Sequence, residues 1–480
     1  MAATHPSDTA DTAPRQPQNS ASAPPLKVVG RRPPPPPLAS LDPYGIYGTR
    51  TANRMRQARR RRNMQKAGLV LFLILMLVVW AVVTRMPRRS PVIASDWKLN
   101  LMLQPSAPPV WAGDEDGVLL VPTDTGRLWA IKPRRETVPA TLPQAILATA
   151  FPLRAQPLVV ASVAYVPCED GALYAVSWQT GRTLWSHDTG APMTTRPALS
   201  RVEVRQSGAA PQPGKSQAIV IAGNDAGQVV ALEASTGRVL WQRLTAAPIG
   251  NGITASRDEA GRPLILVPLL SSVATRGGLW CLDAHTGVPL WKFPGSGQVV
   301  AAQLAPPAVA VRPGSSHVYC VDDAGAVFCL DLKTGRYEKG MGWKSEARPV
   351  SSAGPDDLVM LRGEPLLKQY SWGHRLIVGG NDGGVRCFDA RDGSLQWTFE
   401  AGDAVRCRPR TLRWGPANAP RDLLLIGCDG PAIYILDARD GSLRWKLRTD
   451  GPAFDGPLLA GDSWLALTAN GVLQSFSTPD

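Results

Sequence analysis

The chain has 480 residues, enough to bury a large core, and only 19% of them are charged, while Gly and Pro each occur 45 times. The formal net charge is +13, but residues 1–66 hold 12 Lys and Arg against three acidic residues, and three more arginines lie between residues 85 and 89. Residues 90–480 are therefore nearly neutral, which argues against nucleic-acid binding by a basic surface on the main body of the protein.

The first 66 residues are rich in Pro, Ala, Ser and Thr, with an unbroken proline run at residues 33–37. This composition cannot bury a hydrophobic core, so we expect a disordered, basic tail with local polyproline II structure. The favoured interpretation is an extended spacer. The alternative is a docking peptide for a domain that binds PxxP motifs.

An apolar stretch follows at residues 67–84, and as a helix its 18 residues would be about 27 Å long, close to the thickness of a bilayer core. It is preceded by a cluster of basic residues: Arg54, Arg56, Arg59, Arg60, Arg61, Arg62 and Lys66. This asymmetry predicts a transmembrane signal anchor with a cytoplasmic tail at 1–66, a linker at 85–95, and a periplasmic or other extracytoplasmic body. A cleavable signal peptide is the alternative, but no small-x-small cleavage site follows.

From residue 96 onward the sequence is built from repeats of strand, turn, strand. In the copy at 225–241, Val229, Val230 and Leu232 form a short apolar strand. Thr236-Gly237 then makes a turn, and a second strand begins at residues 239–241 with Trp241. The turn glycine recurs every 48 to 58 residues, at Gly181, Gly237, Gly287, Gly335, Gly393 and Gly441. A β repeat with a period near 50 is typical of a propeller.

Strand–turn–strand units number eight, and the last one lacks room for an outer strand. A spare strand around Trp97 precedes the first unit. We therefore predict an all-β, eight-bladed propeller over 96–480 whose N-terminal strand completes the last blade and removes an open edge.

The repeats end on tryptophan at one register, which predicts structural packing between neighbouring blades rather than a stacking surface for a ligand. The predicted tryptophan-docking set comprises the six turn glycines with Trp97, Trp185, Trp241, Trp291, Trp397 and Trp445. The acidic residue before each turn is expected to bond turn backbone.

Motifs that carry chemistry are not found. There is no CxxC, the five histidines are isolated, and the sequence at 208–216 has the wrong spacing for a phosphate-binding loop. We therefore predict no catalytic, cofactor-binding or metal-ligating residues. Cys320 and Cys329 flank one hairpin turn, and either a disulfide or two buried thiols would suit that position.

The repeat resembles the tryptophan-docking pattern Ala-x-Asp-x-x-Thr-Gly-x-x-x-Trp of the quinoprotein-like eight-bladed propellers, matched here by Ala231, Glu233, Thr236, Gly237 and Trp241. Two groups share this pattern: pyrroloquinoline quinone (PQQ) dehydrogenases, and non-catalytic propellers that assist outer-membrane protein assembly. The chain lacks the adjacent cysteine pair of the alcohol enzymes and is closer in length to the second group.

The resemblance implies a non-enzymatic scaffold without a cofactor, for envelope or outer-membrane protein assembly. The chain departs from the second group in its predicted transmembrane anchor and long tail, which stand in place of a lipid-modified cysteine, so we expect a membrane-anchored scaffold. The alternative is an alcohol or sugar dehydrogenase using PQQ with Ca²⁺. We expect a monomeric propeller that binds protein partners through its loops, of which 205–217 and 344–372 are the longest insertions.

Overall fold

The computed structural model describes residues 54, 59–61, 64–77, 92–114, 117–132, 143–203, 216–245, 247–270, 277–294, 306–311, 314–337, 340, 342–350, 359–361, 363–416, 420–453, 456–460 and 463–477. The chain separates into two compact units, Met1–Pro87 and Arg88–Asp480. Each unit is described by itself.

Among the described residues of the first unit, the longest helical stretch lies at residues 64–77. It covers the first part of the stretch predicted to cross a membrane at 67–84, and residues 78–84 lie outside the described part. No helix among the described residues is long and apolar enough to span a bilayer, so the predicted transmembrane segment is not supported. The predicted tail at 1–66 lies almost wholly outside the described residues.

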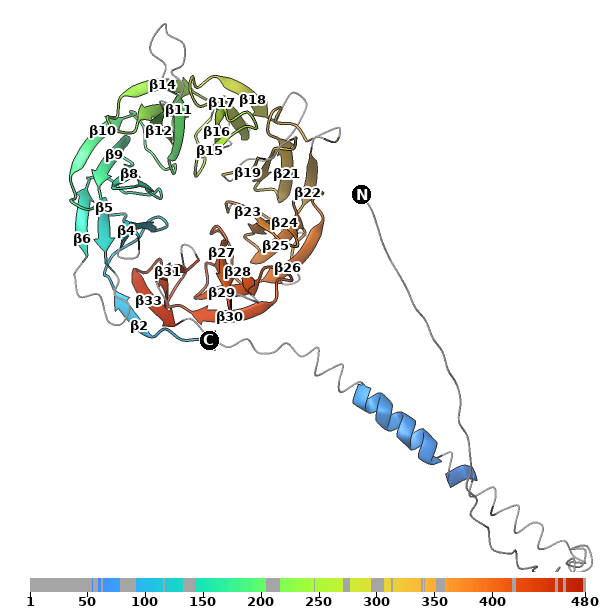
Figure 1. Cartoon of the computed structure of the whole chain (residues 1–480). Coiled ribbons are helices and arrows are strands. Elements are labelled where there is room, and N and C mark those ends of the chain that lie inside the picture. Colours follow the sequence, from blue (N-terminus) through green and yellow to red (C-terminus); the bar gives the residue numbers. More distant parts are fainter. Residues whose placement is uncertain are drawn as a thin grey trace, which may run out of the picture. The chain divides into compact units, whose positions relative to one another are not determined.

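The second unit is a ring of eight antiparallel sheets, the blades, which agrees with the predicted fold class (Figure 1). The first four blades are formed by β3 (Val110–Ala112), β4 (Val118–Pro122), β5 (Arg127–Ile131) and β6 (Gln144–Ala148); β7 (Leu158–Val160), β8 (Val163–Pro167), β9 (Ala172–Ser177) and β10 (Thr183–Asp188); β11 (Ala198–Glu203), β12 (Ser216–Gly223), β13 (Gln228–Glu233) and β14 (Val239–Leu244); and β15 (Thr254–Arg257), β16 (Pro263–Leu269), β17 (Gly278–Asp283) and β18 (Pro289–Phe293).

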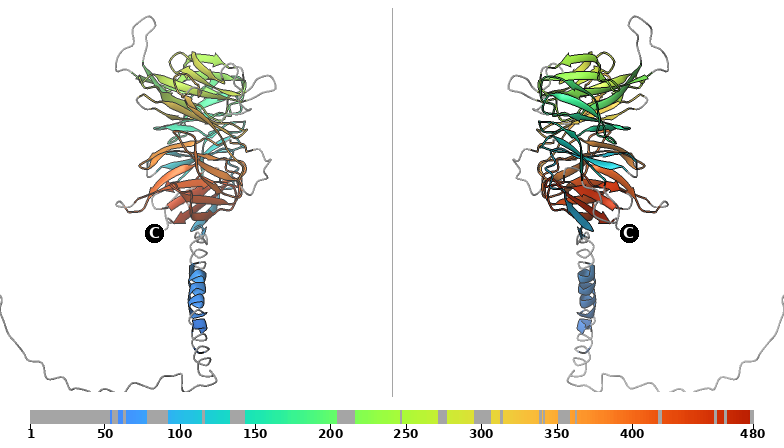
Figure 2. Two further views of the ribbon diagram at one scale, coloured as in Figure 1. Left: turned by 90° about the vertical axis from the view of Figure 1, so that its right-hand side faces the viewer. Right: turned by 90° about the vertical axis from the view of Figure 1, so that its left-hand side faces the viewer.

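The next three blades continue the same order, from the innermost strand to the outermost. They comprise β19 (Ala308–Ala310), β20 (His317–Val321), β21 (Ala326–Asp331) and β22 (Trp343–Glu346); β23 (Leu366–Tyr370), β24 (Gly373–Gly379), β25 (Gly384–Asp389) and β26 (Leu395–Glu400); and β27 (Arg410–Trp414), β28 (Arg421–Gly427), β29 (Ala432–Asp437) and β30 (Leu443–Arg448). Seen edge-on, the blades lie in one disc (Figure 2).

Blade 8 joins the two ends of the second unit. It contains β31 (Leu458–Ala460), β32 (Ser463–Leu467) and β33 (Val472–Ser477), and its outer strand is β2 (Trp97–Asn100). Leu99 pairs with Leu473, and the hydroxyl of Ser477 donates a hydrogen bond to the carboxylate of Asp96 at 2.9 Å. The predicted closure of the ring by the strand around Trp97 is confirmed.

One strand was not foreseen. β1 (Val92–Ile93) pairs in parallel with β30 and adds a fifth strand to the outer edge of blade 7, so part of the predicted linker at 85–95 belongs to a sheet.

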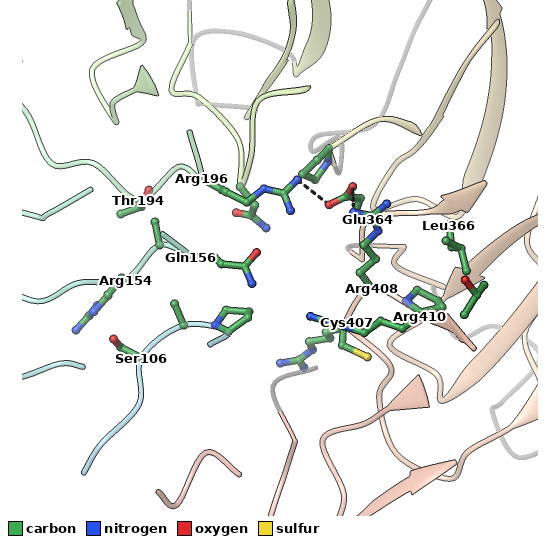
Figure 3. Close-up of a pocket in the computed structure, with 18 residues that line it drawn as sticks. Ser106, Arg154, Gln156, Thr194, Arg196, Glu364, Leu366, Cys407, Arg408 and Arg410 are labelled. Carbon is green, nitrogen blue, oxygen red and sulfur yellow. Dashed lines mark hydrogen bonds and ion pairs between the residues drawn. The ribbon is translucent and has the colours of Figure 1, made fainter. Parts of the chain in front are cut away.

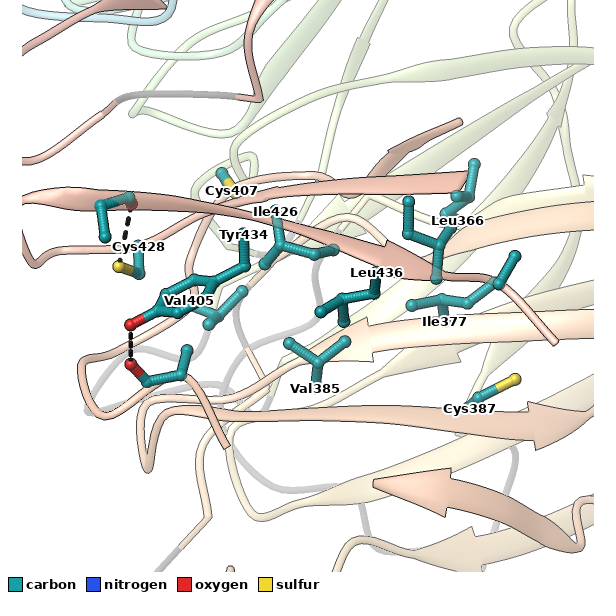
Figure 4. Packing of buried hydrophobic residues seen from close by; sticks show 14 of the residues in the cluster. Leu366, Ile377, Val385, Cys387, Val405, Cys407, Ile426, Cys428, Tyr434 and Leu436 are labelled. Carbon is teal, nitrogen blue, oxygen red and sulfur yellow. Dashed lines mark hydrogen bonds between the residues drawn. The ribbon is translucent and has the colours of Figure 1, made fainter. Parts of the chain in front are cut away.

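The core is distributed around the ring. The described buried apolar residues form eight clusters, and each cluster fills the space between two neighbouring blades. Between blades 6 and 7, Ile377 and Val385 face Ile426 and Leu436 (Figure 4). Middle strands such as β12 are apolar on both faces because a blade covers each face, and a fully buried side chain of this size contributes about 1.5–3 kcal/mol.

The seven cysteines are all buried thiols. Cys320 on β20 lies opposite Phe328, and Cys329 on β21 lies opposite Tyr319, so the two thiols are one residue out of register. Side chains alternate between the faces of a strand, and Cys320 packs toward blade 4 while Cys329 packs toward blade 6. The disulfide left open by the sequence is therefore not formed.

Candidate functional site at the mouth of the central channel

The innermost strands of the blades begin around a central cavity of 740 Å³. In seven blades the residue just before the inner strand is proline, at positions 109, 157, 197, 307, 365, 409 and 457. Proline has no backbone N–H to donate, so within sheets it is suited to edge strands and to the start of a strand, where no neighbouring strand needs that hydrogen bond. In six of these blades the residue before the proline lines the cavity: Pro108, Gln156, Arg196, Pro306, Glu364 and Arg408.

Charge is concentrated in this lining. It holds one carboxylate, that of Glu364, and five arginines: Arg154, Arg196, Arg406, Arg408 and Arg410. Four of the arginines lie in the loops that lead into blades 2, 3 and 7, and Arg410 is the first residue of β27 in blade 7. Residues more than 200 positions apart in the sequence therefore meet at one mouth.

Glu364 links two of these arginines (Figure 3). Its carboxylate accepts from Arg196 of blade 3 at 2.8 Å and pairs with Arg408 of blade 7 at 2.9 Å. The side chain of Glu364 is 13% exposed, against 26% for Arg196 and 47% for Arg408. Arg408 is therefore open to solvent, which limits the stability that its ion pair contributes, whereas the pair of Arg196 with Glu364 is largely buried.

Two other arginines are held by acids outside the cavity lining. Arg154 lies 3.2 Å from Asp124 and 3.4 Å from Glu169, and Arg406 lies 3.2 Å from Asp429. Both arginine side chains are more than half exposed, so these pairs contribute little to stability.

The predicted docking tryptophans join the outer strand of one blade to the turn of the next. Trp241 on β14 donates its indole N–H to the carbonyl of Ala284 at 2.9 Å, and its ring lies against Gly287 in blade 4. Trp185, Trp291 and Trp397 donate in the same way at 3.1, 2.8 and 3.3 Å, to Ala234, Leu332 and Ala438. Their rings lie against the turn glycines of the next blades, Gly237, Gly335 and Gly441.

Two turn glycines meet other side chains. Gly181 packs against Ile146 of β6, an outer strand that carries no tryptophan. Gly393 packs against Trp343, whose indole N–H donates to Ala390 at 3.2 Å. Tyr337, the end of the degenerate repeat copy, packs instead on Phe293 and Phe328.

Sequence reasoning missed Trp343 as a docking residue. The signal that identifies it is the lysine that follows, because Trp343-Lys344 repeats the pairs Trp291-Lys292 and Trp445-Lys446.

Two of the predicted docking tryptophans, Trp445 and Trp97, do not show this contact with a turn glycine of the next blade. Trp445 lies beside Trp464 of blade 8, with ring centroids 6.2 Å apart, because that blade has no Thr-Gly turn. The buried indole N–H of Trp97 has no hydrogen-bond partner among the described residues. Most of the turn between β5 and β6 that it would meet, residues 133–142, lies outside the described part.

The motif carboxylates bond their own turns, as predicted. Asp283 accepts from the backbone N–H groups of His285 and Thr286 at 3.0 and 2.9 Å. Burial acts to raise the pKa of Asp283, but hydrogen bonds from Arg262 and Thr286 hold it below its usual value. Glu233 accepts from the hydroxyl of Thr236 at 2.8 Å, which lowers its pKa. These carboxylates hold turns and lie away from the channel mouth.

The channel mouth does not fit a quinone held by Ca²⁺. Calcium takes roughly six to eight oxygen ligands. The described lining offers one carboxylate, that of Glu364, and it is already bonded to two guanidinium groups. The described lining contains no aromatic ring on which a planar quinone would stack. Across the described residues, no group of three His, Cys, Asp or Glu side chains is placed to hold a metal ion.

Comparison with known families gives one match that covers most of the chain. The family model described as outer membrane protein assembly factor BamB matches residues 79–339 and 381–480.

Individual relatives are more distant. The chain is 26% identical over 255 residues to the outer membrane protein assembly factor BamB of Burkholderia pseudomallei, covering 53% of this chain and 57% of that protein. It is 26% identical over 292 residues to a polyvinylalcohol dehydrogenase of a Pseudomonas species, covering 50% of this chain and 44% of that enzyme. The chain thus spans about half the length of these relatives.

Solved structures agree in fold. BamB from Moraxella catarrhalis superposes with a TM-score of 0.51 at 16% identity, covering 81% of this chain and all of that one. Sqt1 from Saccharomyces cerevisiae gives 0.59 at 12% identity, with 81% of this chain and all of that one covered. Identities this low show the propeller fold alone.

Proposed function

The chain belongs to the family described as outer membrane protein assembly factor BamB, and we propose from this that it is a non-enzymatic scaffold that binds protein partners during envelope assembly. The observation that carries the proposal is the extent of the family match, which includes both the first and the last blades. The closed ring supports it, because a rigid disc presents loops from every blade on fixed supports.

We propose that the partners are proteins bound through the loops of the propeller, with no cofactor and no nucleic acid. The near-neutral charge of residues 90–480 supports the exclusion of nucleic acid. The solvent-accessible arginines at the channel mouth support binding on that face.

A dehydrogenase is the second candidate, since the polyvinylalcohol dehydrogenase matches half of this chain. The lining of the channel mouth argues against it, as described above. The two candidates separate by thermal melting of the purified protein with and without PQQ and Ca²⁺. A ligand at 100 times its dissociation constant stabilises by about 2.7 kcal/mol. A clear shift, with dye reduction in the presence of an alcohol, would support the enzyme.

The location of the protein is a separate proposal. The arginine-rich flank before residue 67 and the apolar stretch at 67–84 support a propeller held outside the cytosol by an N-terminal anchor. A reporter that is active only outside the cytosol, fused after Asp480, should then be active. Activity of a cytosolic reporter at the same position would refute this topology.

The scaffold function itself is tested in the host. Cells that lack the protein should contain less folded β-barrel protein in their outer membrane, and a plasmid copy of the full chain should restore it. Unchanged amounts of barrel protein in cells without the gene would overturn the proposed role in assembly.

A further inference from the structure

Five arginines line the mouth of the channel, and Glu364 forms ion pairs there with arginines from blades 3 and 7. We propose that this mouth docks an acidic segment of a protein partner, and that Glu364 occupies the docking position when the partner is absent. This rests on the proposed scaffold function, since it names the kind of partner segment and the site that receives it.

Charge complementarity identifies the occupant. The cavity lining presents five arginines and one carboxylate, although residues 90–480 as a whole are nearly neutral. Arg154 and Arg406 are paired with acids outside the lining, whereas Arg196 and Arg408 share the single carboxylate of Glu364. Guanidinium groups bind carboxylates through paired N–H donors, which gives them both strength and geometric selectivity. A cavity of 740 Å³ lies within the usual size of roughly 300–1,000 Å³ for binding sites, and it is large enough for several side chains.

Glu364 shows how a carboxylate is bound there. Its two oxygens lie 2.8 Å from Arg196 and 2.9 Å from Arg408, so one carboxylate connects guanidinium groups on blades 3 and 7 (Figure 3). An Asp or Glu side chain of a partner can make the same two contacts.

Displacement of Glu364 exchanges one carboxylate for another, so the number of ion pairs is conserved. Arg408 is 47% exposed, and ion pairs that are open to solvent contribute little to stability. Glu364 also belongs to the long insertion between blades 5 and 6, at the end of which it immediately precedes Pro365 and β23. Glu364 is thus placed to compete with the partner's carboxylate for Arg196 and Arg408.

The test measures binding of a fluorescent peptide of eight glutamates to the purified full chain by anisotropy, at low and at moderate salt. Glu364→Gln keeps the size of the side chain but removes the competing charge, so we expect it to bind the peptide at least fivefold more tightly than the wild type. Arg408→Gln and Arg196→Gln should bind at least fivefold more weakly. Glu364→Gln combined with Arg408→Gln should lose the gain.

The controls distinguish binding of the peptide at this site from attraction by other positive charges on the protein. Arg439→Gln changes an exposed arginine in the turn between β29 and β30 of blade 7 and should leave binding unchanged. A peptide of eight glutamines should not bind. Melting temperatures of all variants identify any that fail to fold, and Arg408→Lys, which keeps the charge but loses the paired donors, then replaces Arg408→Gln.

Three outcomes would overturn the proposal. The first is peptide affinity that is equal in the wild type, Glu364→Gln and Arg408→Gln. The second is an equal loss on Arg439→Gln, which would show non-specific attraction. The third is competition by free glutarate at the same molar concentration as the peptide, which would show a site for small anions.

Failure of this inference is distinguishable from failure of the proposed function. If cells without the protein assemble barrels normally but the peptide binds in the expected order, only the role in assembly is wrong. If Arg408→Gln restores barrel assembly fully and no variant changes peptide binding, only the docking site is wrong.

Discussion

The indole of Trp241 lies flat against Gly287 of the following blade, so closely that a Cβ atom on Gly287 would be 2.5 Å from the ring. The backbone of Gly287 also has a positive φ of 67°, and the Trp241 N–H bonds to Ala284 three residues earlier. One turn therefore provides both a flat surface and a hydrogen-bond acceptor for the preceding blade.

Gly287→Ala should destabilise the propeller by more than the cost of its backbone conformation. Alanine at a positive φ costs about 1–2 kcal/mol, and the clash with Trp241 adds about 1–3 kcal/mol. The free energy of unfolding is measured in guanidinium chloride, with Gly261→Ala as the control. Gly261 has a φ of 80° but no atom within 4 Å of the added Cβ. Equal losses in the two variants would show that the ring contact is unimportant.

Trp343 should be the docking residue of blade 5, and Tyr337 should not. Trp343→Phe removes the bond to Ala390 and part of the contact with Gly393, so we expect a loss of about 1–3 kcal/mol. Tyr337→Phe keeps the ring and should change stability by about 0.5 kcal/mol or less. Both values come from denaturant unfolding, and the reverse order would assign the docking role to Tyr337.

Ring closure should depend on β2 and not on β1. A chain that starts at Ala94 lacks only β1 and should melt cooperatively, close to a chain that starts at Arg88. A chain that starts at Met102 also lacks β2, so the edge of β33 is unpaired, and we expect aggregation and loss of a cooperative transition. Calorimetry and light scattering provide the measurement. If all three chains melt alike, pairing of β2 with β33 does not hold the ring.

The cysteines should titrate as free thiols only when the protein is unfolded. Burial raises the pKa of Cys281, Cys329 and Cys387 to about 12, so little thiolate exists near pH 8. Ellman's reagent should react slowly with the native chain and should detect seven thiols in denaturant without reductant. Five thiols would indicate a disulfide, with Cys320 and Cys329 as the first pair to examine.

The repeat pattern was enough to predict the blades because each element of it has a local cause. Gly287 is required by a turn with positive φ, Asp283 satisfies the N–H groups of that turn, and Trp241 needs the flat surface that glycine leaves. The same logic failed at Trp343, where the outer strand begins later than the repeat spacing suggests. The prediction also failed at Trp445, because the docking contact needs a Thr-Gly turn in the next blade, and blade 8 has none.

The channel mouth could not be read from the sequence in the same way. Arg196, Glu364 and Arg408 come from three blades, and nothing in the repeat spacing shows which residues meet across the channel. The proline that follows each of them marks the position, but the chemistry there varies from blade to blade. Glu364 lies in the insertion 344–372, but the sequence analysis did not single it out within that stretch.

The pairing of β2 with β33 also sets the order in which the molecule is completed. Asp96 and Ser477 are 381 residues apart in the chain but share a hydrogen bond. At a synthesis rate of roughly 5–20 residues per second, β2 waits on the order of 20–75 s for its partner strand to be made. Throughout that time Trp97 and Leu99 lack the strand that covers them, so the newly made chain needs protection from aggregation until its last residues arrive.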